Sequence, residues 1–401
     1  MSEIDFAAGG FPGQEYHELL DALRERGPVV PVRFGDEPAW LITRHAELAA
    51  ALRDNARFPP GAAYRRHTEP PIGRSFISMD EPEHQIYRKL ATPTFRPTAV
   101  ARADRAPLVE LAHELIDEFV GESVSDLVQQ FASRFPLAVI CRALGIPREA
   151  EQDFQRWALG LLSFPFDPEG ARRSGEEFTA YLEPLVRERR RVPKDDVISQ
   201  LIAAEVEGRR LDDEEVLSHI RLLFPTGAET TSGAIGSLLY ALLADAGVWK
   251  QVVEDPSQRE AAIEELLRWE SPVALTPRLA ADTPIEFGGV QIPPGAWVLF
   301  CFAAANRDPR VYREPHRFDP TRRSGRLLTF GPGPRQCPGM HIARKELAVT
   351  LDVFCERLPD LRLLDPTASR PTGTVLRRPE SLTVALGSPR PRLHKGHRSD
   401  R

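Results

Sequence analysis

Apolar residues recur at helical spacing over long stretches of this 401-residue chain, and that pattern restricts the folds open to it. Residues 108–119 and residues 347–358 carry apolar side chains at spacings such as i, i+4 and i+7, which predicts two amphipathic helices. Residues 215–245 form a third and longer helical pattern. We therefore expect a mainly α-helical protein.

Short β-prone runs interrupt the helices at two places. Residues 29–34 and 40–43 flank a connection rich in turn residues and predict a hairpin, and residues 283–302 indicate further short strands. No internal repeat and no Gly/Ser linker divides the sequence. The expected architecture is a single domain over residues 1–387, with one large helical body and a lobe of small β-sheets.

The composition excludes several classes of protein. Lys and Arg number 52 against 58 Asp and Glu, a net charge of −6, so there is no global positive field for nucleic acid. The longest uncharged apolar runs fall short of the ~20 residues that span a bilayer, and the first residues lack the apolar segment of a signal peptide. We expect a cytoplasmic protein without a membrane anchor, whose basic residues 388–401 form a disordered tail.

The most informative segment is FGPGPRQCPG, residues 330–339, which precedes the predicted helix at 347–358. Pro338 suits the first position of a helix, which would place Cys337 at the N-cap, where the helix dipole and free N–H groups favour a thiolate. Such a sulfur can serve as a nucleophile, a redox sensor or a metal ligand, whereas a lone cysteine is by default buried and inert. No second cysteine is adjacent to complete a zinc site, and no motif supplies a histidine base, so a single ligand to a large cofactor suits this loop best.

This segment resembles the F-x-x-G-x-R-x-C-x-G haem-binding loop of the cytochrome P450 superfamily at every fixed position. The resemblance implies the cytochrome P450 fold and a haem b cofactor (iron protoporphyrin IX) whose axial metal ligand is Cys337. It further implies that Phe330 packs beside the sulfur, that Arg335 contacts a haem propionate, and that Gly331 and Gly339 belong to the cofactor loop.

Two further constellations follow the order of motifs in that family. Glu265 and Arg268 are spaced i, i+3 on a predicted helix, which alone is a weak signal because surface pairs of this kind are common. The pair resembles the E-x-x-R motif of the P450 superfamily, and Arg317 matches the third member of its ion triad. The implied role of the triad is structural.

The helical pattern at 215–245 contains a proline and a glycine, which is unusual because both residue types weaken a helix interior. The stretch TGAETT, residues 226–231, resembles the A/G-G-x-D/E-T-T motif of the family. The resemblance implies that Gly227 admits the ring and dioxygen, and that Glu229 and Thr230 pass protons as a catalytic pair. Thr226 stands where the family has a small residue, which is expected to narrow the pocket or to alter substrate orientation. The alternative is that Glu229 is a solvated or ion-paired helix residue.

Four basic residues complete the predicted cofactor site. His84 and Arg88 lie i, i+4 on one face of a predicted helix, where two donors suit an anion. They resemble the propionate-binding H-x-x-x-R of the family, and Arg278 matches a further propionate arginine. Together with Arg335 they would neutralise the two haem carboxylates.

The resemblance implies a soluble bacterial haem-thiolate monooxygenase. Such an enzyme is an oxidoreductase, and the expected role is in secondary metabolism. It would insert one oxygen atom of O₂ into a small apolar organic substrate by hydroxylation or epoxidation, as a monomer, with electrons from NAD(P)H through a separate ferredoxin and ferredoxin reductase. The alternatives are a haem-binding sensor or carrier without oxygenase activity, and a haem-free cysteine hydrolase. Arg65 and Arg66 are candidates to pair with a substrate carboxylate, although exposed loop arginines are commoner.

Overall fold

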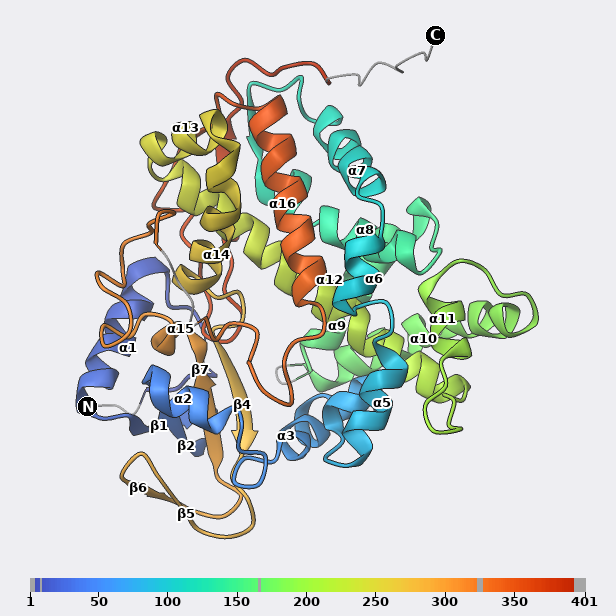
Figure 1. Ribbon diagram of the computed structural model, residues 1–401, viewed down its shortest axis with the longest axis vertical. Coiled ribbons are helices and arrows are strands. Elements are labelled where there is room, and N and C mark those ends of the chain that lie inside the picture. The colour runs from blue at the N-terminus through green and yellow to red at the C-terminus, as the bar shows by residue number, and fades with distance from the viewer. Residues whose placement is uncertain (1–3, 8, 165–166, 323–326, 393–401) are drawn as a thin grey trace.

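The computed structural model describes residues 4–7, 9–164, 167–322 and 327–392, and it is mainly helical (Figure 1). The α-helices run as follows: α1 Gly13–Arg26, α2 His45–Ala51, α3 Pro60–His67, α4 Glu69–Ile72, α5 Glu83–Ala91, α6 Pro97–Arg102, α7 Ala106–Asp117, α8 Phe135–Ala143, α9 Glu151–Leu162, α10 Pro168–Arg191, α11 Val197–Ala203, α12 Asp213–Leu243, α13 Ala246–Glu254, α14 Arg259–Trp269, α15 Phe302–Ala305 and α16 Met340–Arg357. The strands are β1 Val29–Phe34, β2 Glu37–Ile42, β3 Val124–Asp126, β4 Leu275–Leu279, β5 Ile285–Phe287, β6 Val290–Ile292, β7 Trp297–Cys301, β8 Arg362–Leu363 and β9 Thr383–Ala385. The three helices and the hairpin predicted from periodicity are confirmed as α7, α12, α16 and β1–β2.

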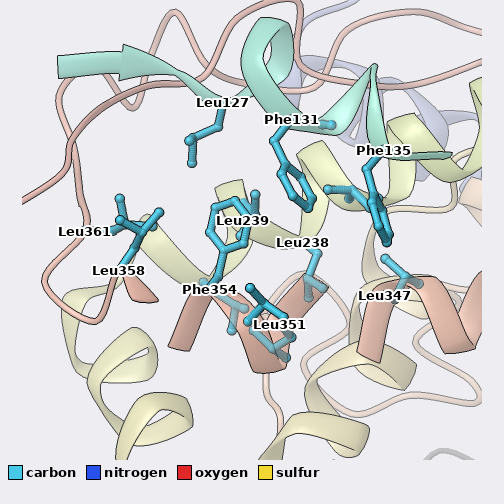
Figure 2. Close-up of a cluster of buried hydrophobic side chains, with 14 of the residues drawn as sticks. Leu127, Phe131, Phe135, Leu238, Leu239, Leu347, Leu351, Phe354, Leu358 and Leu361 are labelled. Carbon is cyan, nitrogen blue, oxygen red and sulfur yellow. The ribbon is translucent and has the colours of Figure 1, made fainter. Parts of the chain in front are cut away.

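The helical body is organised around α12, which packs against α8, α9, α10, α14 and α16. Figure 2 shows part of the core between α12 and α16, where Leu238 lies among Leu347, Leu351 and aromatic rings. The ring of Phe131 meets that of Phe354 edge-on, at a centroid distance of 4.8 Å. Burial of these apolar faces is the main force that holds the two central helices together.

The β-lobe lies beside this body, at the lower left of Figure 1. Its main sheet has the order β1-β2-β7-β4, in which β2 and β7 are parallel and the other pairs are antiparallel. Gly35, with φ +64°, begins the two-residue turn between β1 and β2. Two smaller sheets, β3-β9-β8 and β5-β6, complete the strands, so the predicted combination of a helical body with small sheets is confirmed.

The helix α12 continues without interruption through Pro225 and Gly227 for 31 residues. Two hydroxyls bond back to its carbonyls: Thr226 donates to Leu222 at 2.7 Å and Thr230 donates to Thr226 at 2.6 Å. A Cβ on Gly227 would lie 2.7 Å from Cδ1 of Ile140, so a larger residue there would require the Ile140 side chain of α8 to shift. The sequence anomaly therefore marks a close helix contact within a regular helix.

A buried ion cluster joins α14 to the segment that leads to the cysteine loop. Arg268 pairs with Glu265 at 2.7 Å, and both side chains are fully buried. The third side chain is that of Arg322, whose Nε lies 3.1 Å from Glu265, whereas Arg317 is exposed and supplies only its backbone carbonyl to Arg268. The prediction of Arg317 as the third member is therefore wrong, because a turn between residues 317 and 322 brings the later arginine inward.

Part of the predicted basic tail lies within the described residues. Arg392 pairs with Glu110 and Asp117 near the end of α7, and the side chain of Arg357 donates to the carbonyl of Arg390 at 2.7 Å. The expectation of disorder is thus wrong for residues 388–392, and residues 393–401 lie outside the described part. No single helix among the described residues is long and apolar enough to cross a membrane, although α12 and α13 pass that test as a pair bent by 105°.

The ion cluster yields a prediction about stability. Arg322→Ala should lower the free energy of unfolding by about 3–5 kcal/mol, because the buried Glu265 carboxylate loses its ion pair with Arg322. Arg317→Ala, which removes an exposed side chain five residues away, should change it by less than about 0.5 kcal/mol. Urea unfolding of the two variants, matched for haem content, measures both. Equal losses would contradict the assignment of Arg322 to the cluster.

Candidate active site

One cavity of about 860 Å³ dominates the helical body, and the predicted cofactor residues border it. These residues come from α5, α12, β4 and the loop before α16, which are far apart in the sequence. Those that border the cavity are His84, Arg88, Gly227, Arg278, Phe330, Gly331, Arg335, Cys337 and Gly339, together with Thr230. Of the predicted cofactor and catalytic residues, Glu229 alone is not part of the cavity wall.

The cysteine loop is held by its own backbone. The N–H of Cys337 donates to the carbonyl of Phe330 at 2.9 Å, and Gly331 adopts a φ of +60° that favours glycine. Helix α16 begins at Met340 with Gly339 as its N-cap, so the prediction of Cys337 at the N-cap is wrong by two residues. Pro338 and Gly339 instead form a turn before the helix.

The sulfur of Cys337 is enclosed by protein but open to the cavity. The N–H groups of Gly339 and Met340 still face it and lower the pKa of the thiol, as do Arg88 and Arg344. Burial outweighs these effects and raises that pKa above its ordinary value, so the expected preference for a thiolate is not met by the polypeptide alone. A bound cation would supply the missing stabilisation, which suits a metal ligand better than a free nucleophile.

Basic side chains face the same cavity with incomplete partners. His84 bonds Glu81 through Nδ1 at 2.9 Å, but its buried Nε2 has no hydrogen-bond partner in the described part of the chain, and the same holds for Nε of Arg335. Burial, followed by the charge of Arg335, lowers the pKa of His84 to about 4. Burial likewise lowers the pKa of Arg335 to about 10. The unpartnered Nε–H of Arg335 in an electropositive wall fits an anionic group. Such an anion would also favour protonation of His84, which makes its Nε2 a donor.

The two remaining basic residues are fixed by neighbours. Arg88 donates to the carbonyl of Gln336 at 2.5 Å, which ties α5 to the residue beside Cys337. The guanidinium of Arg278 lies over the rings of Tyr64 and Phe300, at 5.0 and 5.6 Å from their centroids. Sequence reasoning missed Tyr64, which borders the cavity from α3.

The residues of α12 divide between two sides of the helix. Thr226, Gly227 and Thr230 border the cavity, whereas the Glu229 carboxylate forms an ion pair with Arg378. Burial raises the pKa of Glu229, and Arg378 opposes that effect. The structure therefore places Thr230 in the cavity and gives Glu229 the ion-paired arrangement that the sequence left as the alternative.

A second acid was not foreseen. Glu346, on α16, is the one carboxyl residue that borders the cavity among the described residues, and it is 2% exposed. Its Oε2 has no hydrogen-bond partner there, and burial raises its pKa well above the ordinary value. A glutamate within an amphipathic helix gives no sequence signal for this position, because surface glutamates are common in such helices.

The rest of the cavity wall is mostly apolar and carries no further charge among the described residues. Representative side chains are those of Phe76, Ile140, Leu144, Leu201, Phe224 and Val273. Arg65 pairs with Asp80 at 3.0 Å and Arg66 pairs with Glu37 at 2.5 Å, and neither borders the cavity. The hypothesis that they bind a substrate carboxylate is therefore wrong.

Comparisons with known proteins agree on one family. Residues 148–358 match the cytochrome P450 family. The 6-deoxyerythronolide B hydroxylase of Saccharopolyspora erythraea is 34% identical over 87% of this chain and 90% of its own length. The vitamin D(3) 25-hydroxylase of Pseudonocardia autotrophica is 33% identical over 96% of both chains. Among solved structures, cytochrome P450 CYP109Q5 from Chondromyces apiculatus has a TM-score of 0.86 at 32% identity, covering 95% of this chain and 97% of its own.

The relatives and the solved structure align with 87–96% of this chain, and both curated relatives are named as hydroxylases. Members of the matched family bind haem, and the thiol and the orphaned donors around the cavity suit such a group. The chain belongs to the cytochrome P450 family and is a haem-dependent monooxygenase.

Proposed function

We propose that Cys337 is the axial ligand of the haem iron and that His84, Arg88, Arg278 and Arg335 bind the two propionates. The single observation that carries this proposal is the convergence of one thiol and four basic side chains on one cavity that holds one carboxyl residue among those described. Arg88 joins the two groups, because it donates to the backbone next to the sulfur. Haem, when bound, supplies oxygen activation, and a thiolate ligand favours cleavage of the O–O bond.

The chain's own residues would then orient the cofactor and exclude water. The N–H groups of Gly339 and Met340 stabilise negative charge on the sulfur, and Phe330, with Arg344 4.5 Å above its ring, packs beside the loop. Gly227 has no side chain and therefore leaves space beside α12, on the other side of the cavity. These groups hold the cofactor between α16 and α12.

Proton supply is the proposed task of Glu229 and Thr230. Thr230 holds a proton at Oγ1 in the cavity wall, and the adjacent Glu229 is 10% exposed on the side of α12 that meets Arg378. Burial raises the pKa of the Glu229 carboxyl, so this group holds a proton more readily than an exposed glutamate. Thr226, one turn earlier, narrows the wall where the family has a smaller residue.

The substrate that fits this wall is neutral and apolar. A carboxylate-bearing guest would find only the basic groups assigned to the propionates, because Arg65 and Arg66 are engaged elsewhere. One relative is named for polyketide chemistry, the polyketide biosynthesis cytochrome P450 PksS of Bacillus subtilis, which is 32% identical over 88% of this chain. We propose hydroxylation or epoxidation of a neutral polyketide-like molecule in bacterial secondary metabolism.

The remaining partners are proposed on the same basis. Solved P450 structures cover 92–98% of this chain, so the P450 fold accounts for nearly all of the 401 residues. Electrons are expected from NAD(P)H through a separate ferredoxin and ferredoxin reductase. We expect the enzyme to be a cytoplasmic monomer in which residues 1–387 form one domain. No observation favours a sensor or carrier, and the raised pKa of Cys337 argues against a cysteine hydrolase.

The visible spectrum tests the ligand assignment. The reduced, CO-bound protein should show the red-shifted haem band of thiolate ligation, because Cys337 would be the only sulfur that borders the cavity among the described residues. Cys337→Ser should abolish that shift. The matched control is Cys355→Ser, which changes a buried cysteine away from the cavity and should leave the band in place. A colourless purified protein would overturn the proposal.

Haem retention tests the propionate assignment. Arg335→Gln should speed the transfer of haem to apomyoglobin about 10-fold or more, because a charge-assisted hydrogen bond contributes about 1.5–3 kcal/mol. Arg65→Gln is the matched control, since Arg65 is a nearby arginine that does not border the cavity. Equal transfer rates for the two variants would refute the role of Arg335.

The proton-supply proposal predicts a change in the fate of electrons. Thr230→Ala should keep haem content and the CO spectrum while diverting NADPH electrons into hydrogen peroxide, because the cavity wall loses its hydroxyl. Thr230→Ser restores a hydroxyl and should restore most of the coupling. Peroxide formed per NADPH consumed is the measurement, and an unchanged ratio in Thr230→Ala would count against the relay.

A further inference from the structure

Arg378 connects a buried acid of the central helix to the protein surface. Its guanidinium forms an ion pair with Glu229, and its side chain is 41% exposed whereas that of Glu229 is 10% exposed. Among the described residues, Arg378 is the charged group that acts on the pKa of Glu229, and it opposes the effect of burial. The charge state and the direction of Glu229 thus depend on one arginine.

The segment that carries Arg378, residues 372–378, is firmly seated. The backbones of Arg378 and Thr372 bond to each other in both directions, and the N–H of Arg377 donates to the carbonyl of Pro272 at 2.9 Å. The buried side chain of Arg377 pairs with Glu270 at 2.6 Å. The backbone of the segment is therefore fixed, and the Arg378 side chain extends from it to pair with Glu229.

The same segment meets both α12 and the cavity. A Cβ on Gly233 would lie 3.1 Å from the carbonyl oxygen of Arg377 and 3.4 Å from Cβ of Arg378, so the segment rests directly on α12 one turn beyond Glu229. Val375 and Leu376 of this segment form part of the cavity wall. A single stretch of chain thus touches the substrate space and holds the acid proposed to supply protons.

We propose that Arg378 is a positioning residue that restrains Glu229, by holding its carboxylate against segment 372–378 and off the cavity. This inference rests on the proposed role of Glu229 in proton supply. The restraint limits proton delivery to the cavity, and it is applied by the segment that also forms part of the cavity wall. Arg378 itself does not border the cavity.

The first test follows the Glu229 carboxyl directly in the haem-loaded protein. Infrared titration of the protonated carboxyl band, identified by its loss in Glu229→Gln, should give a higher midpoint in Arg378→Gln than in the wild type, because burial then acts unopposed. Arg378→Lys keeps the charge and should stay close to the wild type. Arg362→Gln, which changes an exposed arginine on β8, is the matched control.

The second test measures substrate-free turnover with a surrogate ferredoxin and ferredoxin reductase. Arg378→Gln should raise the rate of NADPH oxidation without substrate severalfold, because Glu229 is no longer held off the cavity. In the Glu229→Gln background, the same Arg378→Gln change should have no further effect, since Arg378 acts through Glu229.

These outcomes separate the inference from the function on which it rests. A polypeptide that fails to bind haem through Cys337 overturns the proposed function. Normal haem binding with an unchanged Glu229 titration in Arg378→Gln overturns the restraint alone. An acceleration that is absent, or that persists in the Glu229→Gln background, overturns it equally, because Arg378 would then act by another route.

Discussion

The burial of positive charge around one sulfur is the constraint on which this structure depends. Four basic side chains and the Cys337 thiol border the same cavity, and burial lowers the pKa values of His84, Arg88 and Arg335 while it raises that of the thiol. Keeping Arg88 and Arg335 charged in this wall costs the polypeptide free energy, and so would ionising the buried thiol. An anionic ring that carries a central cation would offset both kinds of cost at once. The folded chain is in this sense incomplete without its cofactor.

The walls that bear this charge are placed by apolar packing. The core between α12 and α16, shown in Figure 2, fixes the distance between the helix that follows Cys337 and the helix that carries Thr230. The Glu265–Arg268–Arg322 cluster then links α14 to the segment before the cysteine loop. Because most of these contacts lie outside the cavity, the site can carry unsatisfied groups without losing the fold.

The sequence predicted the features that depend on local patterns, such as helices and short motifs. It did not predict the features that depend on contacts between distant residues. Apolar periodicity located α7, α12 and α16, and short motifs in four separate segments indicated the candidate cofactor residues that the fold brings to a single cavity. The start of α16 could not be fixed within two residues, because proline is compatible with both a turn and a first helical turn. The choice of Arg322 over Arg317 depends on how a turn folds back, and the pairing of Arg378 with Glu229 spans 149 positions. Neither has a local signal.

Glu229 and Glu346 lie near the cavity, and their negative charge is removed in different ways. This difference affects which substrates the cavity can bind. The Glu229 carboxylate forms an ion pair with Arg378 outside the cavity wall. Glu346 borders the cavity and no cation acts on its pKa, so burial favours its neutral form. Neither acid therefore places an uncompensated negative charge in the space left for substrate. With the basic groups assigned to the cofactor, that space is electrically neutral and mostly apolar, and a guest is selected there by shape and by the few hydroxyls of the wall, such as those of Tyr64 and Thr226.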